Sequence, residues 1–219
     1  MVNVNEIEEI KEYPEDLLGS IFEKQQELAN KYVEIEGMGN LLDKTETNLD
    51  TKVGQMWIKD FLYRTIEEVG ESYEVIFAHG IRPFERLSEE EEIHYAEELI
   101  DGLHFLVELC IIAGIKKNDI AENLNHLGDH YEDGMESNDF KRRHWNIVYY
   151  LTLAGNKLRN KKWKQTEVLT DRPIFKNNIL NAFESLITAL RAVGYNSQDI
   201  YSLYFKKNKV NQFRQRSKY

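Results

Sequence analysis

Two pairs of acidic residues have the spacing of a metal site. Glu68 and Glu71 are three residues apart, and so are Glu98 and Asp101. In a helix, residues three apart lie on one face with their Cβ atoms roughly 5–6 Å from each other. Apolar neighbours such as Val69 indicate that some of these acids point toward the interior, where uncompensated carboxylates are costly. Four carboxylates on two helices suit a hard divalent cation, so we predict a Mg²⁺ site with Mn²⁺ as a substitute.

The other acids nearby have a simpler explanation. Glu67, Glu74, Glu97 and the run 89–92 fit solvated helix faces and the first turn of a helix, where negative charge is favoured. The pairing, and not any single acid, indicates the metal site.

A second candidate site lies at the C-terminus. Residues 205–219 contain six Lys or Arg and no acid, although the whole chain has a net charge of −10. Lys207, Asn211 and Arg214 are four and three residues apart, so they form one stripe of a helix. Two cations and an amide on that stripe can grip a triphosphate. The alternative is a solvated basic terminus, and we expect the stripe to lie beyond the last strongly apolar turn of its helix.

These motifs together resemble a known family. E-E-x-x-E followed by E-x-x-D is the motif of the all-α nucleoside triphosphate pyrophosphohydrolases, which include MazG-like proteins, dimeric dUTPases and phage dCTPase/dUTPases. The chain has EEVGE at 67–71 and, after 26 residues, ELID at 98–101. GLHFLVELCIIAGI after the second motif and the ending DIYSLYFKKNKVNQFRQRSKY are similar to the dUTPase and phage dCTPase/dUTPase branch.

The resemblance implies Mg²⁺-dependent hydrolysis of a pyrimidine deoxynucleoside triphosphate, dUTP, dCTP or both, to the monophosphate and pyrophosphate. It implies Glu68 and Glu71 as catalytic residues, with Glu68 preferred as the acceptor of a proton from the attacking water. Lys207 and Arg214 would stabilise the leaving pyrophosphate. The resemblance also implies a homodimer. It leaves open whether the base is uracil, cytosine or a modified pyrimidine.

Base contacts are expected from the first helix. The resemblance implies a Gln followed by Leu-Asn there, and the chain reads QQELAN at 25–30, with Ala in the place of the expected Asn. Gln26 is the candidate from this segment. Trp57 is either a wall on which the base stacks or, equally, a core aromatic residue. His104, three residues after Asp101, is a partner of the metal ligands or, as we favour, a core histidine.

The elements that must position these residues are helices. Three Pro and few alternating runs of strand length predict an all-α bundle in a single domain, 1–219, with a helical insertion at about 116–172. Two central antiparallel helices carry the acidic motifs, and the first of them is expected to end at His79. We expect about seven helices, at 16–36, 51–79, 88–114, 120–131, 139–158, 171–194 and from 196 into the basic tail.

Composition excludes several classes. Apolar residues make up 42% of the chain, which is enough for a core, and one Cys excludes a disulfide scaffold or a zinc site of several thiolates. The acidic balance argues against nucleic acid and membrane partners. The N-terminus has no charged-then-apolar signal pattern. We therefore expect a cytoplasmic protein, in the host cell if phage-encoded.

Two rival functions remain at this point. A ferritin-like di-metal carboxylate bundle requires Glu-x-x-His on two helices, and only Glu91 with His94 provides it. A non-enzymatic acidic helical interaction module needs no metal, but it does not predict the basic stripe.

Overall fold

The structure is a computed structural model that describes residues 10–77, 87–125, 127, 137–161 and 163–216. Within these ranges every regular element is a helix, which confirms the all-α prediction. The eight helices are α1 (Leu17–Glu36), α2 (Thr45–Asn48), α3 (Lys52–Phe77), α4 (Glu89–Ile112), α5 (Lys117–Leu124), α6 (Ser137–Lys157), α7 (Arg172–Ala192) and α8 (Ser197–Arg216).

The observed helices differ from the predicted set in two places. The single turn α2 was not expected, and it accounts for the eighth helix. The predicted end of the second helix at His79, and most of residues 125–131 of the fourth, lie outside the described residues.

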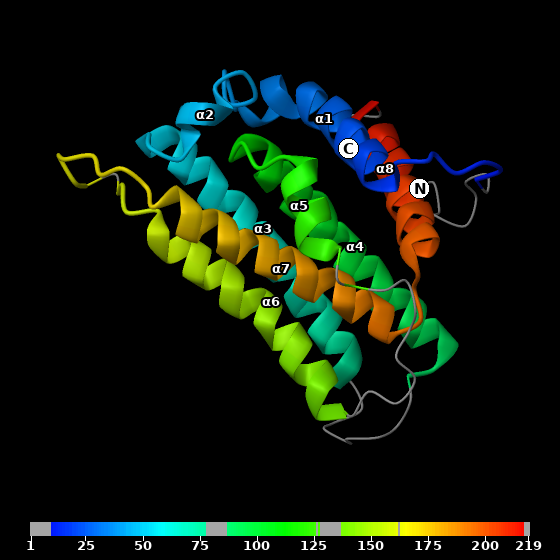
Figure 1. Cartoon of the computed structure of the whole chain (residues 1–219). Helices are drawn as coiled ribbons and strands as arrows, with labels where there is room; N and C mark the ends of the chain where they lie inside the picture. The colour runs from blue at the N-terminus through cyan, green and yellow to red at the C-terminus, as the bar shows by residue number, and fades with distance from the viewer. Residues whose placement is uncertain (1–9, 78–86, 126, 128–136, 162, 217–219) are drawn as a thin grey trace.

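Helices α3 and α4 form the centre of the bundle and run antiparallel (Figure 1). Their pairing brings Gly102 of α4 against Thr65 and Glu68 of α3. Helices α1 and α8 pack on one side of α4, and the pair α6 and α7 packs on the other side of the central helices. The central helices therefore have neighbours on two sides, and α4 contacts both outer layers.

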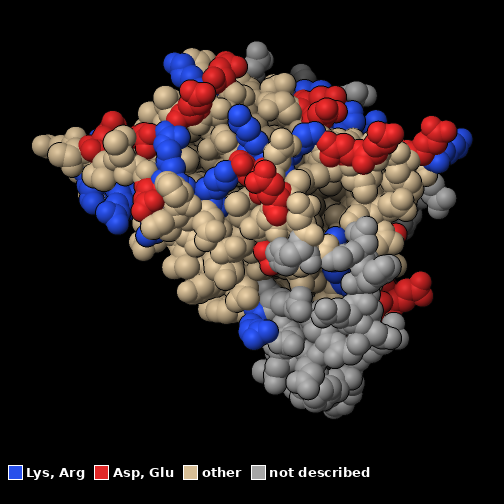
Figure 2. All heavy atoms as spheres, viewed as in Figure 1, with Lys and Arg blue, Asp and Glu red and all other residues tan. Residues whose placement is uncertain are grey.

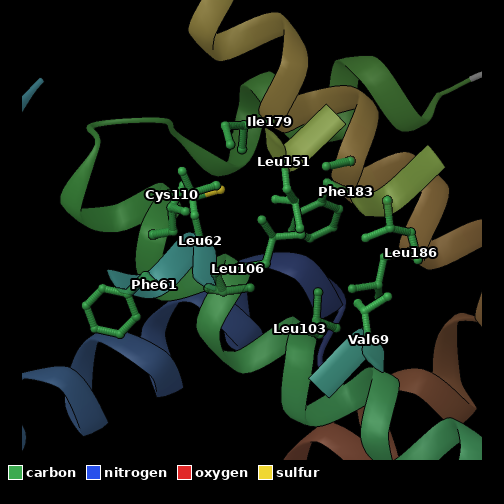
Figure 3. Packing of buried hydrophobic residues seen from close by; sticks show 14 of the residues in the cluster. Phe61, Leu62, Val69, Leu103, Leu106, Cys110, Leu151, Ile179, Phe183 and Leu186 are labelled. Atoms are coloured by element: carbon green, nitrogen blue, oxygen red, sulfur yellow. The ribbon is translucent and has the colours of Figure 1, made fainter. Parts of the chain in front are cut away.

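The core explains why one half of α4 is apolar almost all round. From Leu103 to Ile112 this helix buries side chains toward α3, α7 and α8, so it has no face that requires a polar stripe. Figure 3 shows three helices meeting it in the core. The labelled residues are Phe61, Leu62 and Val69 of α3, Leu103, Leu106 and Cys110 of α4, Leu151 of α6, and Ile179, Phe183 and Leu186 of α7.

Capping residues fix the helix starts that position the site. The backbone N–H of Ser88 donates to Glu91 Oε2 at 2.7 Å, and the N–H of Glu91 donates to Ser88 Oγ at 3.3 Å, so these two residues form a capping box at the start of α4. Asp171 caps α7 through the N–H of Ile174, and the segment ends near Gly194, which has a φ of 92°. Helix starts read from short polar motifs thus agree with the structure.

The segment 116–172 contributes to the same core. Ile147, Leu151 and Ala154 of α6 are fully buried. His144, also fully buried, lies 3.1 Å by Nε2 from the carbonyl oxygen of Val69 in α3, while the hydroxyl of Tyr95 in α4 lies 3.0 Å from its Nδ1. Helix α6 is therefore tied to both central helices. That this segment is an insertion stays a prediction.

The surface carries both signs of charge. On the face shown in Figure 2, Lys and Arg are interspersed with Asp and Glu, without a large patch of one sign. Among the described residues, no helix combines the length and the apolar character needed to span a bilayer.

Candidate metal and nucleotide site

Three of the four predicted metal ligands come together. Glu68 from α3 and Glu98 and Asp101 from α4 each offer a carboxylate oxygen, and these oxygens lie within 4.8 Å of one another. Within the described residues this is the one group of three or more candidate metal-binding side chains. Glu71, one turn further along α3, is exposed and stands outside the group. Its charge still acts on the site, because it raises the pKa values of Glu68 and Glu98.

Ionisation of Glu68 and Glu98 in this cluster is unfavourable without a bound cation. Burial, followed by the charges of Asp101, Glu71 and Glu98, raises the pKa of Glu68 to about 7. Burial also raises the pKa of Glu98, against the opposing charge of Lys207. A bound divalent cation would favour the ionised carboxylates, because its positive charge would compensate for the lost contact with water and for the neighbouring negative charges. The donor set, oxygen only and on two packed helices, fits Mg²⁺ or Mn²⁺.

Lys207 is part of this cluster. Its Nζ lies 2.6 Å from Asp101 Oδ2, and its side chain is 15% exposed. The basic stripe was expected beyond the last apolar turn of its helix, and that expectation is wrong for Lys207, whereas Arg214 is exposed and follows the last buried apolar residue, Val210. Val210 and Tyr204 of α8 are buried on either side of Lys207, because this part of α8 packs against α4. The ammonium group therefore reaches the acids from within the packed part of the helix.

A cavity of about 250 Å³ opens beside the acid cluster. It lies between α1, α3, α4 and α8, and both Glu68 and Asp101 contribute to its wall. The predicted stripe residues Asn211 and Arg214 also line it, so the acids and the C-terminal stripe share one cavity. The remaining lining residues are Gln25, Leu28, Tyr32, Glu36, Arg64, His104, Phe105 and Glu108.

A chain of hydrogen bonds crosses the end of this cavity away from the acid cluster. The hydroxyl of Tyr204 donates to Gln25 Oε1 at 2.6 Å, and Gln25 Nε2 donates to Glu108 Oε2 at 2.7 Å. All three side chains are buried. Burial raises the pKa of Glu108 to about 7, although the hydrogen bond from Gln25 opposes this shift. The cavity therefore contains two acids with a pKa of about 7, Glu68 of α3 at the acid cluster and Glu108 of α4 at the other end.

His104 presents an unsatisfied acceptor in the same wall. Its Nδ1 lies 2.9 Å from the carbonyl oxygen of Ile100, so Nδ1 carries the proton. Its Nε2 is buried without a hydrogen-bond partner. The ring stacks on Tyr204 with centroids 3.9 Å apart, and burial lowers its pKa to about 4. His104 is therefore neutral, with a buried Nε2 lone pair that has no partner among the described residues.

Gln25, and not the predicted Gln26, reaches the cavity. Gln26 donates instead to Asn30 Oδ1 on the outer face of α1. The sequence does contain a signal for Gln25, because it lies between Ile21 and Leu28 on the apolar stripe of this helix. Trp57 is partly buried against the core and does not line this cavity.

Sequence reasoning also missed Glu108. It was noticeable as the one acid in the apolar run 105–115, and it follows Asp101 by seven residues, which is two helical turns.

The ferritin-like alternative loses its one motif, because Glu91 caps α4 and His94 Nε2 contacts Glu98 at 3.0 Å.

Comparison with known proteins identifies a family for this arrangement. A family model described as dUTPase matches residues 17–219, which is almost the whole chain. Searches of curated proteins and of solved structures gave no significant match.

Proposed function

The chain belongs to the dUTPase family, and from this premise we propose that it hydrolyses dUTP, dCTP or both to the monophosphate and pyrophosphate in a Mg²⁺-dependent reaction. The observation that carries the proposal is one cavity whose wall includes Glu68 and Asp101 of the three-carboxylate cluster at one end and the buried polar side chains of Gln25 and Glu108 at the other. Nucleotide hydrolysis needs a metal-binding end for the phosphates and an enclosed end for the nucleoside, and the two ends of this cavity would serve these two purposes.

The acids of α3 and α4 would bind the metal and accept the proton of the attacking water. Glu68, Glu98 and Asp101 would hold the metal, with Glu71 completing the set from the next turn of α3. When bound, Mg²⁺ neutralises phosphate charge and lowers the pKa of a coordinated water. Glu68 is the preferred proton acceptor, because its carboxylate belongs to the acid cluster and lines the cavity from which a metal-bound water would attack.

The phosphates would be bound by α8. Lys207 reaches Asp101, so its ammonium group would be available to phosphate oxygens of a triphosphate held by a metal at the acid cluster. Asn211 and Arg214 follow on the same stripe and line the cavity. A guanidinium binds phosphate oxygens bidentately, and these groups would stabilise charge on the leaving pyrophosphate.

We also propose a homodimer. Helix α3 has an exposed apolar face formed by Val53, Met56 and Tyr63, of which Val53 and Tyr63 are about three-fifths exposed. Spacings of three and seven residues place these side chains on one side of the helix. A second copy of the chain is the partner that the proposal requires for this face.

The test of the function is pyrophosphate release from each natural dNTP with Mg²⁺, with Mn²⁺ and with a chelator. We expect turnover of dUTP or dCTP, none with the chelator, and loss of turnover in Glu98→Gln. Glu122→Gln, which changes an exposed acid of α5, is the matched control. Metal-independent turnover, or no release from any dNTP, would overturn the proposal.

A further inference from the structure

We propose that Glu108 is a base-binding residue that holds the hydrogen-bonding edge of a pyrimidine, uracil or cytosine, as a neutral carboxylic acid. The inference rests on the proposed function, and it assigns a role to an acid that the metal chemistry does not use.

One strip of α4 connects the two ends of the cavity. Asp101, His104, Phe105 and Glu108 are spaced by three, one and three residues, and all four line the cavity. With a rise of about 1.5 Å per residue, Asp101 and Glu108 are roughly 10 Å apart along the helix axis. A nucleotide whose phosphates lie at the acid cluster therefore has its base near Glu108.

The chemistry of the base favours a protonated acid. Uracil presents an N3–H donor between two carbonyl acceptors. A neutral carboxyl group matches one donor–acceptor pair, since its C=O accepts from N3–H while its O–H donates to the adjacent carbonyl. An ionised carboxylate has acceptors only, so its second oxygen would face the base carbonyl without a proton between them.

The contacts of Glu108 leave Oε1 and the second lone pair of Oε2 for the base. Oε2 accepts from Gln25, whose own Oε1 accepts from Tyr204, so the amide cannot rotate without breaking a buried hydrogen bond. The proton of the neutral acid therefore belongs on Oε1.

The charged neighbours do not provide Glu108 with a free counter-ion. Arg64 of α3 is held bidentately by Glu36 of α1, at 2.9 and 3.0 Å, and also contacts Asp60. The other titratable groups that line this cavity near Glu108 are Tyr32 of α1, Arg214 of α8 and His104 of the same helix, and Tyr204 of α8 lies behind Gln25. The negative charge of Glu36 itself raises the pKa of Glu108. Because Arg64 is shared between two carboxylates, burial dominates and the pKa of Glu108 rises to about 7.

A dependence of binding on pH follows. If only the neutral form of Glu108 holds the base, affinity is full below pH 7 and falls above it, by roughly tenfold at pH 8. Glu108→Gln keeps one donor and one acceptor at this position at every pH, so it should bind without that step. Glu108→Met removes both and should bind weakly throughout.

The experiment is calorimetric titration of the wild type, Glu108→Gln and Glu108→Met with α,β-imido-dUTP and Mg²⁺ between pH 6 and 8.5. Titration of the triphosphate and of the metal site occurs in all three proteins, so the difference between wild type and Glu108→Gln isolates Glu108. Glu122→Gln is the control for loss of an acidic charge, and thermal melts check that each variant is folded. The cytosine analogue is titrated in parallel, because cytosine N3 and its amino group also match a neutral carboxyl.

The expected result is a fall in wild-type affinity above pH 7 that Glu108→Gln abolishes and Glu122→Gln retains. Identical pH profiles in wild type and Glu108→Gln, alongside normal dUTP turnover, would overturn the inference and leave the function standing. Failure of the wild type to bind either analogue or to hydrolyse any dNTP would overturn both. A melting change in the Glu108 variants without a binding change would assign the residue to structure alone.

Discussion

The ionised form of Glu68 is unfavourable in the metal-free protein, because its carboxyl group is half-buried and lies near other negative charges. Its pKa is raised by burial first and then by three acids, so the metal-free protein is more stable with this group protonated. That contribution is fully present below the unfolded value of 4.5 and is lost as pH rises through about 7.

Glu68→Gln should therefore raise the melting temperature of the metal-free protein at pH 8 and leave it nearly unchanged at pH 4.5. The same variant should lower turnover by roughly 10²–10⁴ and reduce the Mg²⁺-induced rise in melting temperature. Thermal melts at both pH values, with and without Mg²⁺, measure this. Retained turnover would remove Glu68 from the metal and base roles.

Lys207 partly compensates the acid cluster in the protein without metal. Lys207→Met should lower the melting temperature of the metal-free protein, because Asp101 loses its 2.6 Å partner, at a cost of roughly 1–3 kcal/mol. The variant should gain more stability from added Mg²⁺ than the wild type does, since no ammonium group competes for Asp101. Equal Mg²⁺ responses in the two proteins would contradict this competition, and isothermal titration with Mg²⁺ provides the independent measurement.

For individual residues, the sequence allowed prediction of features that depend only on spacing within one helix. The pair Glu98 and Asp101 and the helix start at 88 are local patterns, and the structure contains them, whereas Glu71 of the other predicted pair stands outside the acid cluster. The ion pair of Lys207 and the hydrogen bond of Gln25 to Glu108 were not predictable, because each joins residues from helices far apart in sequence. Their formation depends on how α1 and α8 dock on α4.

At the scale of the elements, α6 is attached to the central helices through a buried histidine. Burial lowers the pKa of His144 to about 4, and its hydrogen bond to the carbonyl of Val69 opposes that shift. The folded state therefore keeps His144 neutral where the unfolded chain takes up a proton. This contribution is present above pH 6.5 and is lost as pH falls toward 4.

His144→Gln should flatten the loss of stability on acidification, by on the order of 3 kcal/mol between pH 6.5 and 4. His104 has a pKa lowered in the same way, so part of the acid sensitivity should persist in the variant and disappear only in a double variant. Urea denaturation at pH 7, 5.5 and 4.5 measures the slope. An unchanged slope in His144→Gln would mean that His144 is not the group that titrates.

Helix positions were the most predictable part of the molecule. Caps and apolar periodicity located seven helices, whereas the single turn α2 has too few residues to show a period. Periodicity also could not reveal that α6 contacts α3 and α4, since burial of one face says nothing of which helix covers it.

For the whole molecule, a dimer is the expected state. Size-exclusion chromatography with light scattering should give about twice the chain mass of 25.9 kDa. Met56→Glu combined with Tyr63→Glu should yield monomers, because an isologous interface brings like charges together. Trp163→Glu, at a residue that is 79% exposed outside the helices, is the control. A dimer that survives the double substitution would place the interface elsewhere, and a wild-type monomer would exclude the dimer.

The number of residues between Asp101 and Glu108 sets both the distance between them along α4 and the side of the helix on which each lies. Adding one residue between them turns Glu108 by about 100° around the helix and moves it out of the cavity wall. Substitutions at Leu103 or Leu106 would alter packing alone, but an insertion would separate the two ends of the cavity even with every side chain retained. Among homologous chains that keep both ends, the number of residues in this interval should therefore vary less than their identity.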